Sequence, residues 1–254
     1  METISIHKPK VVVIGSCNTD MVVKANRLPV PGETVLGGTF YMNPGGKGAN
    51  QAIAASRLGA EVTFISKIGY DLFGLQALEI YKSEKINTEF IFTDQKSPSG
   101  VALISVDSFG ENSIIVAPGA SRSLSIEDIN KAEEKIKEAD IILMQLEVPI
   151  ETAEFAATIA NKYNKKVILN PAPASTLSDT FLRNIHTILP NRIEAEMLSG
   201  IKVIDIESAH RAAKTIGDKG IENVVITLGK DGAYVKEKDK YAMIPAKQVE
   251  SSVS

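Results

Sequence analysis

Several residue types that define particular classes of protein are scarce in this 254-residue chain. Its one cysteine, Cys17, excludes an internal disulfide framework and fits a reducing cytoplasm, where we expect the protein to be located. The three histidines lie far apart, and none has metal-ligand spacing. No apolar run is long enough to span a membrane, and residues 1–10 contain no apolar signal core. We therefore expect neither a histidine-rich metal centre nor a membrane partner.

Charge of one sign is also scarce. The formal net charge is −3, and 23% of the residues are charged. Nucleic acids and anionic membranes bind proteins through clustered positive charge, so the sequence argues against both as partners. Hydrophobic residues make up 44% of the chain, which is ordinary for a globular protein that buries a large core. We expect residues 1–254 to form a single α/β domain.

Short, almost fully apolar runs alternate with amphipathic segments along the chain. The apolar runs are 10–15, 61–66, 140–144, 166–170, 186–189 and 223–228. The amphipathic segments are 48–58, 73–82, 126–137, 150–163 and 207–219. Apolar runs of this kind are typical of parallel strands that are buried on both faces. The alternation predicts an α/β fold with a doubly wound, mostly parallel sheet flanked by helices.

Two segments do not fit that alternation. Residues 17–41 and 86–116 contain strand-like runs that are separated by proline and glycine. Period-two runs with such turn residues predict a small antiparallel β lid beside the main sheet. A lid of this kind can exclude water from a site during group transfer. The alternatives are a structural appendage or a dimer surface, and the lid and dimer roles are compatible.

The most informative stretch is Asn43–Ala52, which reads NPGGKGANQA and leads into an alanine-rich helix. Glycine lets a backbone pass close to a ligand, and a helix N-terminus offers unpaired N–H groups to oxygen-rich ligands. Lys47 and Asn50 add side-chain donors on the same turn. The stretch therefore predicts a site for a small polar molecule. The alternative is a glycine-rich turn followed by a stable helix.

Two common phosphate motifs do not match this stretch. A Walker A loop fails because Tyr41 stands where its first glycine is required, and Gly48 stands where serine or threonine should follow the lysine. The dinucleotide fingerprint fails because Gln51 replaces its third glycine. The second failure disfavours a nicotinamide-dependent dehydrogenase.

Polar residues or glycines follow five of the predicted strands. They include Asn18, Asp20, Gln145, Glu147, Asn170, Asn191, Glu194, Thr227, Gly229 and Gly232. Open α/β sheets bind ligands outside the carboxyl ends of their strands, so these residues predict a cleft along one edge of the sheet. Asn18 and Asp20 could bind vicinal hydroxyls there.

Asn191 and Glu194 allow two interpretations. A hydrated Mg²⁺ ion keeps several waters and contacts only one or two protein groups, and these two residues could hold one. Alternatively, Asn191 caps a helix and Glu194 is the reciprocal glutamate of a capping box. The residues alone leave both interpretations open.

Collinear motifs in the chain resemble those of the ribokinase-like sugar kinases, also called pfkB carbohydrate kinases. The matching stretches are 15–20, 31–35, 45–60, 144–147, 170–174, 190–191 with 194–196, and 226–229 with Gly232. The resemblance implies ATP-dependent transfer of a phosphoryl group to the O5 hydroxyl of D-ribose. It also implies that the β lid covers the sugar and forms the contact of a homodimer.

The resemblance assigns a role to each matching residue. The sugar side would consist of Asn18, Asp20, Gly46, Lys47, Gly48, Asn50 and Glu147. The ATP side would consist of Asn191, Thr227, Gly229 and Gly232, with Asn191 and Glu194 ordering water around Mg²⁺. This division is physically sensible because phosphoryl transfer depends mostly on positioning and on neutralisation of charge.

The family pattern also requires a segment that residues 1–254 do not contain. This segment, Asp-Thr-x-(Ala/Gly)-Ala-Gly-Asp, should follow the strand pair near 233–244. Its last aspartate is the general base, its amides bind the transferred phosphoryl group, and its loop binds K⁺. We therefore expect the general base to lie beyond residue 254, and Ser251–Ser254 to mark a premature end such as a frameshift.

Without that segment the 254-residue polypeptide should have little or no kinase activity. Loss of a general base and loss of an oxyanion donor each cost on the order of a hundredfold in rate. The alternatives to an active enzyme are a non-catalytic sugar-binding remnant and a non-functional fragment. The resemblance also leaves open another sugar, or a nucleoside, as the substrate.

Overall fold

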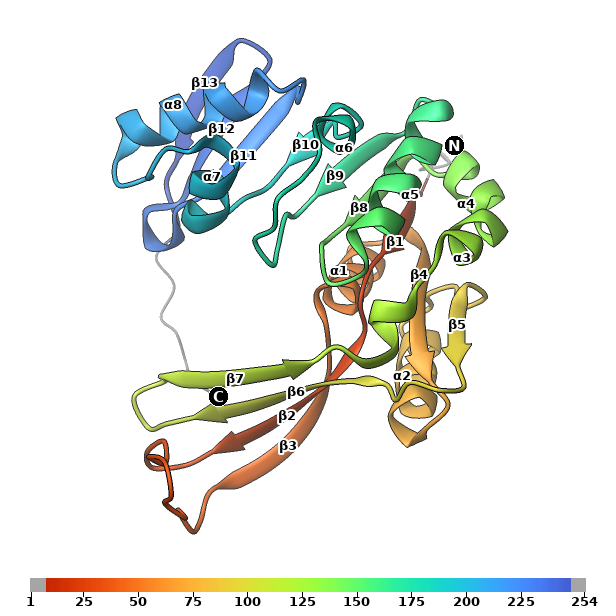
Figure 1. Ribbon diagram of the computed structural model, residues 1–254, viewed down its shortest axis with the longest axis vertical. Helices are drawn as coiled ribbons and strands as arrows, with labels where there is room; N and C mark the ends of the chain where they lie inside the picture. Colours follow the sequence, from red (N-terminus) through yellow and green to blue (C-terminus); the bar gives the residue numbers. More distant parts are fainter. Residues whose placement is uncertain (1–7, 248–254) are drawn as a thin grey trace, which may run out of the picture.

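The computed structural model describes residues 8–247, and its largest element in that range is a nine-stranded sheet (Figure 1). The strand order is β13-β12-β11-β10-β9-β8-β1-β4-β5. These strands are β1 (Lys10–Ile14), β4 (Glu61–Gly69), β5 (Ile91–Asp94), β8 (Ile141–Met144), β9 (Lys166–Leu169), β10 (Thr187–Ile188), β11 (Asn223–Thr227), β12 (Ala233–Glu237) and β13 (Lys240–Ile244). All pair in parallel except β12 and β13, which extend one edge in antiparallel fashion.

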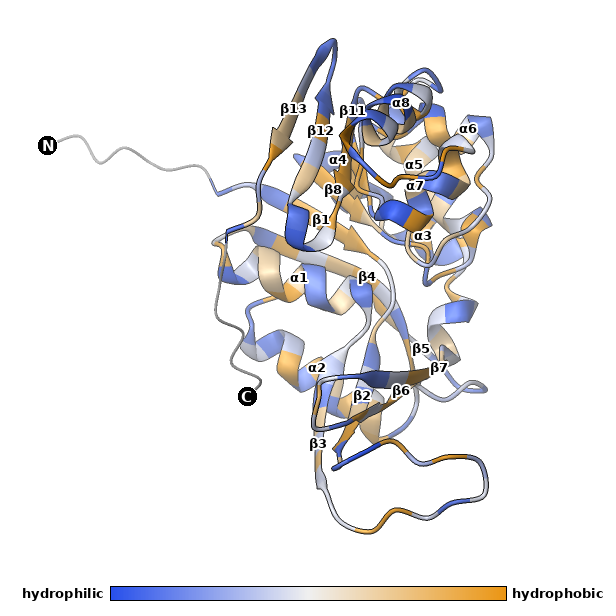
Figure 2. Ribbon diagram, turned by 90° about the vertical axis from the view of Figure 1, so that its left-hand side faces the viewer, coloured by the Kyte–Doolittle hydropathy of each residue, from blue (hydrophilic) through white to orange (hydrophobic). Residues whose placement is uncertain are grey.

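Helices cover both faces of this sheet, as the alternating pattern predicted. The helices are α1 (Lys47–Arg57), α2 (Leu72–Ser83), α3 (Ile126–Lys131), α4 (Glu133–Glu138), α5 (Ile150–Lys162), α6 (Asp179–Arg183), α7 (Arg192–Ser199) and α8 (Ile206–Gly217). Side chains alternate between the faces along β1: Val11 and Val13 pack in the same buried cluster as α1 and α2, whereas Val12 and Ile14 pack in the cluster of the other face. Figure 2 shows hydrophobic residues concentrated on the central strands β1 and β8.

The six predicted strands and the five predicted helical segments are all present, with small differences in length. The segment predicted as one helix over 126–137 is divided into α3 and α4 at Ala132. No helix within residues 8–247 is long and apolar enough to cross a membrane. The stretch Ser251–Ser254, which the sequence marked as a premature end, lies outside the described residues.

A smaller sheet projects from the large one and forms the lid (Figure 1). Its described strands are β2 (Asn18–Lys24), β3 (Thr39–Gly45), β6 (Gly100–Val106) and β7 (Asn112–Ala117), in the order β3-β2-β6-β7. The β2–β3 and β6–β7 pairings are antiparallel, and β2 pairs with β6 in parallel.

The predicted lid range of 86–116 began too early. Strand β5 lies in the large sheet, where it pairs in parallel with β4. The reason is burial: Ile86 and Ile91 are almost inaccessible to solvent and pack in the cluster beneath α1 and α2. The second lid segment therefore consists of β6 and β7 alone.

Candidate active site

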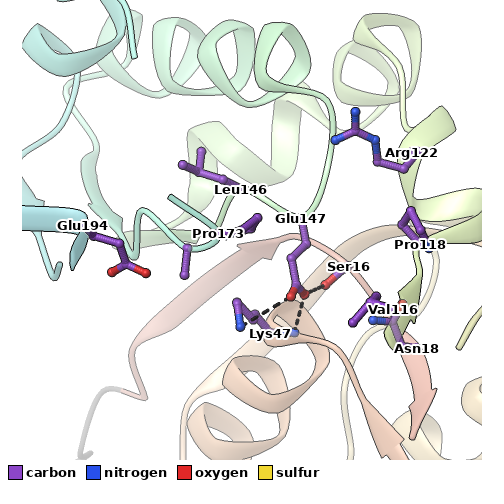
Figure 3. Close-up of a pocket in the computed structure, with 11 residues that line it drawn as sticks. Ser16, Asn18, Lys47, Val116, Pro118, Arg122, Leu146, Glu147, Pro173 and Glu194 are labelled. Atoms are coloured by element: carbon purple, nitrogen blue, oxygen red, sulfur yellow. Dashed lines mark hydrogen bonds and ion pairs between the residues drawn. The ribbon is translucent and has the colours of Figure 1, made fainter. Parts of the chain in front are cut away.

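A cavity of about 440 Å³ lies where the carboxyl ends of β1 and β8 approach the lid (Figure 3). Four of the sequence-predicted residues line it: Asn18, Lys47, Glu147 and Glu194. They come from the lid, from the start of α1, from the loop after β8 and from α7. Sequence positions up to 176 apart thus meet at one sheet edge, as the strand-end argument predicted.

Glu147 is the centre of the polar contacts in this cavity. One of its carboxylate oxygens, Oε2, accepts hydrogen bonds from the Ser16 hydroxyl and from the backbone N–H of Lys47, the latter at 2.9 Å. The other oxygen, Oε1, lies 3.4 Å from the Lys47 ammonium nitrogen. Figure 3 shows these contacts converging on the carboxylate. Glu147 is therefore held in one orientation before any ligand binds.

The start of α1 explains why Glu147 is held there. Lys47 is the first residue of α1, and the preceding Gly46 has a φ of 88° and provides no side-chain cap. The first N–H groups of a helix have no partner within the helix and carry a partial positive charge. The Glu147 carboxylate takes the place of the missing cap, from a position 100 residues further along the chain.

Asn18 and Asp20 lie on one face of β2, because side chains two residues apart share a face of a strand. Their neighbours across the lid are glycines: Gly45 has no side chain to collide with the Asp20 carboxylate, and Gly100 leaves room for the Asn18 amide. Asn18 is almost fully buried, yet its Oδ1 has no hydrogen-bond partner within the described part of the chain. An orphaned buried oxygen is costly, and this one lies against Gly100 with almost no exposed surface.

The electrostatics of Asp20 differ from those of an ordinary surface carboxylate. Burial raises the pKa of Asp20, the nearby negative charge of Glu147 raises this pKa further, and the positive charge of Lys47 partly offsets both effects. Asp20 does not itself line the cavity, but its carboxyl is close enough to Glu147 and Lys47 to be influenced by their charges. Such a set of acceptors and one cation suits a neutral, hydroxyl-rich ligand.

The remaining residues of the predicted sugar loop have other surroundings. Gly48 packs against the end of β1, where an added Cβ would lie 2.6 Å from the Ser16 carbonyl oxygen. This close approach brings the start of α1 to the cavity, but Gly48 itself does not line the cavity. Asn50 is exposed on the first turn of α1 and does not line it either.

Asn191 and Glu194 form a complete capping box at the start of α7. The Glu194 backbone N–H donates to Asn191 Oδ1 at 2.9 Å, and the Asn191 N–H donates to Glu194 Oε2 at 2.8 Å. The capping interpretation is thus realised. Glu194 nevertheless lines the cavity, and its second carboxylate oxygen accepts no hydrogen bond from residues 8–247.

The second Glu194 carboxylate oxygen fits a hydrated Mg²⁺ ion that is held mainly through water. One carboxylate oxygen at the cavity is enough for such an ion, because Mg²⁺ keeps most of its water shell. Residues 8–247 contain no group of three or more histidine, cysteine or acidic side chains that could hold a metal directly. The residues therefore fit a water-mediated site at Glu194 and not a fully protein-coordinated one.

The predicted ATP-side residues lie beside this capping box. The Thr227 N–H donates to the Pro190 carbonyl at 2.9 Å, and Asn191 and Thr227 form an isolated parallel bridge. The turn that follows, η2 (Gly229–Asp231), has Gly229 at φ 64° and is closed by Gly232 at φ 103°. The structure thus brings Asn191, Thr227 and the glycine turn together at one end of the sheet.

Two polar cavity residues, Ser16 and Arg122, were missed by the sequence reasoning. Ser16 directly follows the β1 strand and its glycine, so the strand-end rule could have found it. Arg122 follows β7 in the short helix η1 (Gly119–Ser123), and its exposed side chain lines the cavity. No pattern near Arg122 signals this position, because it depends on how the lid joins the large sheet.

The doubly wound sheet, the β lid and the cavity between them define the ribokinase-like class of α/β proteins. The chain belongs to the pfkB family carbohydrate kinases, whose family profile matches residues 8–254. Members of this family are phosphotransferases that act on an alcohol group.

Named relatives agree with this assignment. A ribokinase of Haemophilus influenzae is 47% identical over 232 residues, which are 91% of this chain and 76% of that protein. A deoxyribokinase of Salmonella typhimurium is 37% identical over 240 residues, with 94% and 78% covered. The structure of an Arabidopsis thaliana ribokinase complexed with ribose and ATP superposes with a TM-score of 0.84 at 29% identity, covering 96% of this chain and 80% of that one.

Proposed function

We propose that the cavity binds D-ribose and that the site serves transfer of the ATP γ-phosphoryl group to the sugar O5 hydroxyl. The observation that carries this proposal is the preoriented Glu147 carboxylate, which lines the cavity together with Asn18 and Lys47. A carboxylate that is already held in place can accept a further hydrogen bond from a ligand hydroxyl without first being ordered. The names of the relatives, and the ribose in the Arabidopsis ribokinase complex, support a pentose as that ligand.

In this proposal the sugar is held by acceptors on two sides. From the lid, the Asn18 amide would donate to a sugar hydroxyl and the Asp20 carboxylate would accept from one, and from the sheet edge Glu147 Oε1 would accept from another. The Lys47 ammonium group, 3.4 Å from Glu147, offsets the repulsion between the negative charges of Asp20 and Glu147. Gly46 would contribute by placing the start of α1 beside the cavity, whereas the exposed Asn50 would have to reorient to contact the sugar.

The nucleotide is proposed to lie on the Glu194 side of the cavity. Asn191, Thr227, Gly229 and Gly232 would line it, since the structure groups them around one turn. Mg²⁺, held through water at Glu194, would supply neutralisation of the phosphate charge. Residues 1–254 lack the segment that supplies a K⁺ site in the family pattern, so no role is assigned to K⁺.

We propose further that a polypeptide limited to residues 1–254 binds ribose with little or no turnover. Its sequence contains no Gly-Ala-Gly-Asp segment to provide the general base and the anion-binding amides. Asp231, the acidic residue in the glycine turn, forms an ion pair with Arg192 at 2.8 Å. It is therefore not positioned as a substitute base.

Calorimetry and a turnover assay on the 254-residue polypeptide test both parts. D-ribose should bind, and Glu147→Gln should weaken binding about tenfold, because a charge-assisted hydrogen bond is lost. Ribose-dependent ADP formation with ATP, Mg²⁺ and K⁺ should be at least about a thousandfold below that of an intact ribokinase measured alongside.

Each result has a defined meaning. Absence of ribose binding would overturn the sugar assignment, whereas rapid ADP formation would overturn only the proposed inactivity. Titrations with 2-deoxy-D-ribose and D-fructose compare the affinities of two other sugars with that of D-ribose. Deoxyribose is included because one relative is named a deoxyribokinase. Tighter binding of either would reassign the substrate.

We also propose that the lid mediates a homodimer. Its strands expose Met42, Leu103 and Ile115 in one row on the face opposite Asp20, as the strand register shows. A largely apolar hollow of about 640 Å³ lies between this face and the start of α2. An exposed apolar row beside an apolar hollow suits a second copy of the same surface, because each copy supplies both parts.

A further inference from the structure

One guanidinium group joins three segments next to the proposed nucleotide turn. Arg192, the first residue of α7, donates from Nη2 to the Asp231 carboxylate at 2.8 Å and to the Leu228 carbonyl at 3.4 Å. Its Nη1 donates to the Val203 carbonyl, in the loop between α7 and α8, at 3.2 Å. No motif in the sequence pointed to Arg192.

Apart from those of Arg192, the hydrogen bonds at this turn within residues 8–247 come from its own backbone and do not connect it to α7. Two glycines with positive φ, Gly229 and Gly232, bound the turn, and glycine restricts the backbone least of all residues. At the turn the Leu228 N–H donates to Gly232 O at 2.8 Å, the Gly232 N–H donates to Gly229 O at 3.0 Å, and the Asp231 N–H donates to Leu228 O at 3.4 Å. Gly229, Lys230 and Asp231 are all exposed.

Arg192 also stands directly after the Asn191 cap, so it couples two parts of the site. On one side is the capping box that orients Glu194 towards the cavity. On the other is the glycine turn after β11. A planar guanidinium with several N–H donors can contact three acceptors at once, which a lysine ammonium in the same place would do poorly.

We propose that Arg192 is a positioning residue for nucleotide binding: it fixes the Gly229–Asp231 turn relative to the start of α7. The backbone amides of the turn and the Glu194 carboxylate are then held at a constant separation. This inference rests on the proposed nucleotide side of the cavity. It also gives Asp231 a structural role as the acceptor that anchors the turn.

Hydrogen exchange and nucleotide binding together test this proposal. In the 254-residue polypeptide, Arg192→Ala should raise amide exchange in the turn at 229–232 about fivefold and weaken binding of ADP with Mg²⁺ by a similar factor. Asp231→Ala should have a smaller effect in the same direction. The variant with both substitutions should show the same exchange rates and ADP affinity as Arg192→Ala alone. Once Arg192 is gone, Asp231 has no ion pair for its own substitution to remove.

Arg211→Ala is the matched control, since it removes an exposed arginine from the neighbouring helix α8 without touching the turn. It should change neither measurement. Unchanged exchange in Arg192→Ala would overturn the proposal, as would faster exchange without weaker ADP binding. If the unaltered polypeptide binds no ADP, the proposed nucleotide side fails, and the exchange comparison still decides whether Arg192 fixes the turn.

Discussion

At the scale of single residues, the site depends on contacts between positions that are far apart in the sequence. Asn18, Lys47 and Glu147 could be predicted, because each follows a recognisable strand or begins a recognisable helix. The Ser16–Glu147 hydrogen bond could not be predicted, since it requires the β1–β8 pairing and the position of the loop after β8. Gly100 was missed for a similar reason, because its role depends on the β2–β6 register.

Removal of the Ser16 hydroxyl tests how far preorientation of Glu147 contributes. Ser16→Ala leaves Glu147 with the Lys47 contacts only, so the carboxylate gains freedom that ribose binding must then restrict. We expect ribose to bind about fivefold more weakly by calorimetry, with a change in Tm of roughly 2 °C or less. Ser83→Ala, an exposed serine at the end of α2, is the control and should bind ribose normally. Equal ribose affinity in the unaltered chain, Ser16→Ala and Ser83→Ala would contradict the role of Ser16.

The raised pKa of Asp20 predicts a pH-dependent effect on stability. An acid whose pKa is higher in the folded state destabilises that state once the pH is high enough to ionise it. This loss of stability is absent below about pH 3.9, the pKa of an aspartate in the unfolded chain. It builds up between that pH and the raised pKa of Asp20 in the folded protein, and it is complete at higher pH. Asp20→Asn should therefore raise Tm by roughly 2 °C at pH 7 and by almost nothing near pH 3.5.

The same substitution should weaken ribose binding at pH 7, which would show that stability is given up for the site. Asp239→Asn, in the exposed turn between β12 and β13, provides the control and should show no such gain in Tm. A gain of equal size for Asp20→Asn at both pH values would rule out titration of this carboxyl as the cause.

At the scale of elements, the long periodic patterns predicted the large sheet and its main helices well. The failures are local: β5 has an ordinary apolar pattern, and only its burial against α2 decides that it joins the large sheet.

Helix α7 both stabilises its own start and positions a side chain at the cavity. Its capping box stabilises the helix start and, by the same hydrogen bonds, turns Glu194 towards the cavity.

Glu194→Gln separates these two purposes. Glutamine at the third helical position still accepts the Asn191 N–H, so the capping box and Tm should be nearly unchanged. The charge that we propose orders water around Mg²⁺ is lost, so the gain in ADP affinity on addition of Mg²⁺ should fall about fivefold or more. Titrations of ADP with and without Mg²⁺ measure this gain. An unchanged gain would assign Glu194 to capping alone.

At the scale of the whole molecule, the cavity exists because the lid and the large sheet meet at the carboxyl ends of β1 and β8. The sequence predicted both parts and the edge of the sheet at which the cavity lies. It did not predict which face of the lid turns towards the cavity, because that depends on the strand register and on the way β2 leaves β1. The register places Asn18 and Asp20 on the cavity side and leaves the opposite face apolar.

The opposite face of the lid gives the sharpest test of assembly. Ile115 on this face and Ile114 on the cavity side are adjacent in β7 and both more than half exposed. Ile115→Lys places a charge in the apolar row with Met42 and Leu103, where burial against a second copy would be costly. It should convert a dimer into a monomer by light scattering. Ile114→Lys adds the same charge to the other face and should remain dimeric. Dissociation by both variants, or a monomeric unaltered chain, would exclude this face as the dimer contact.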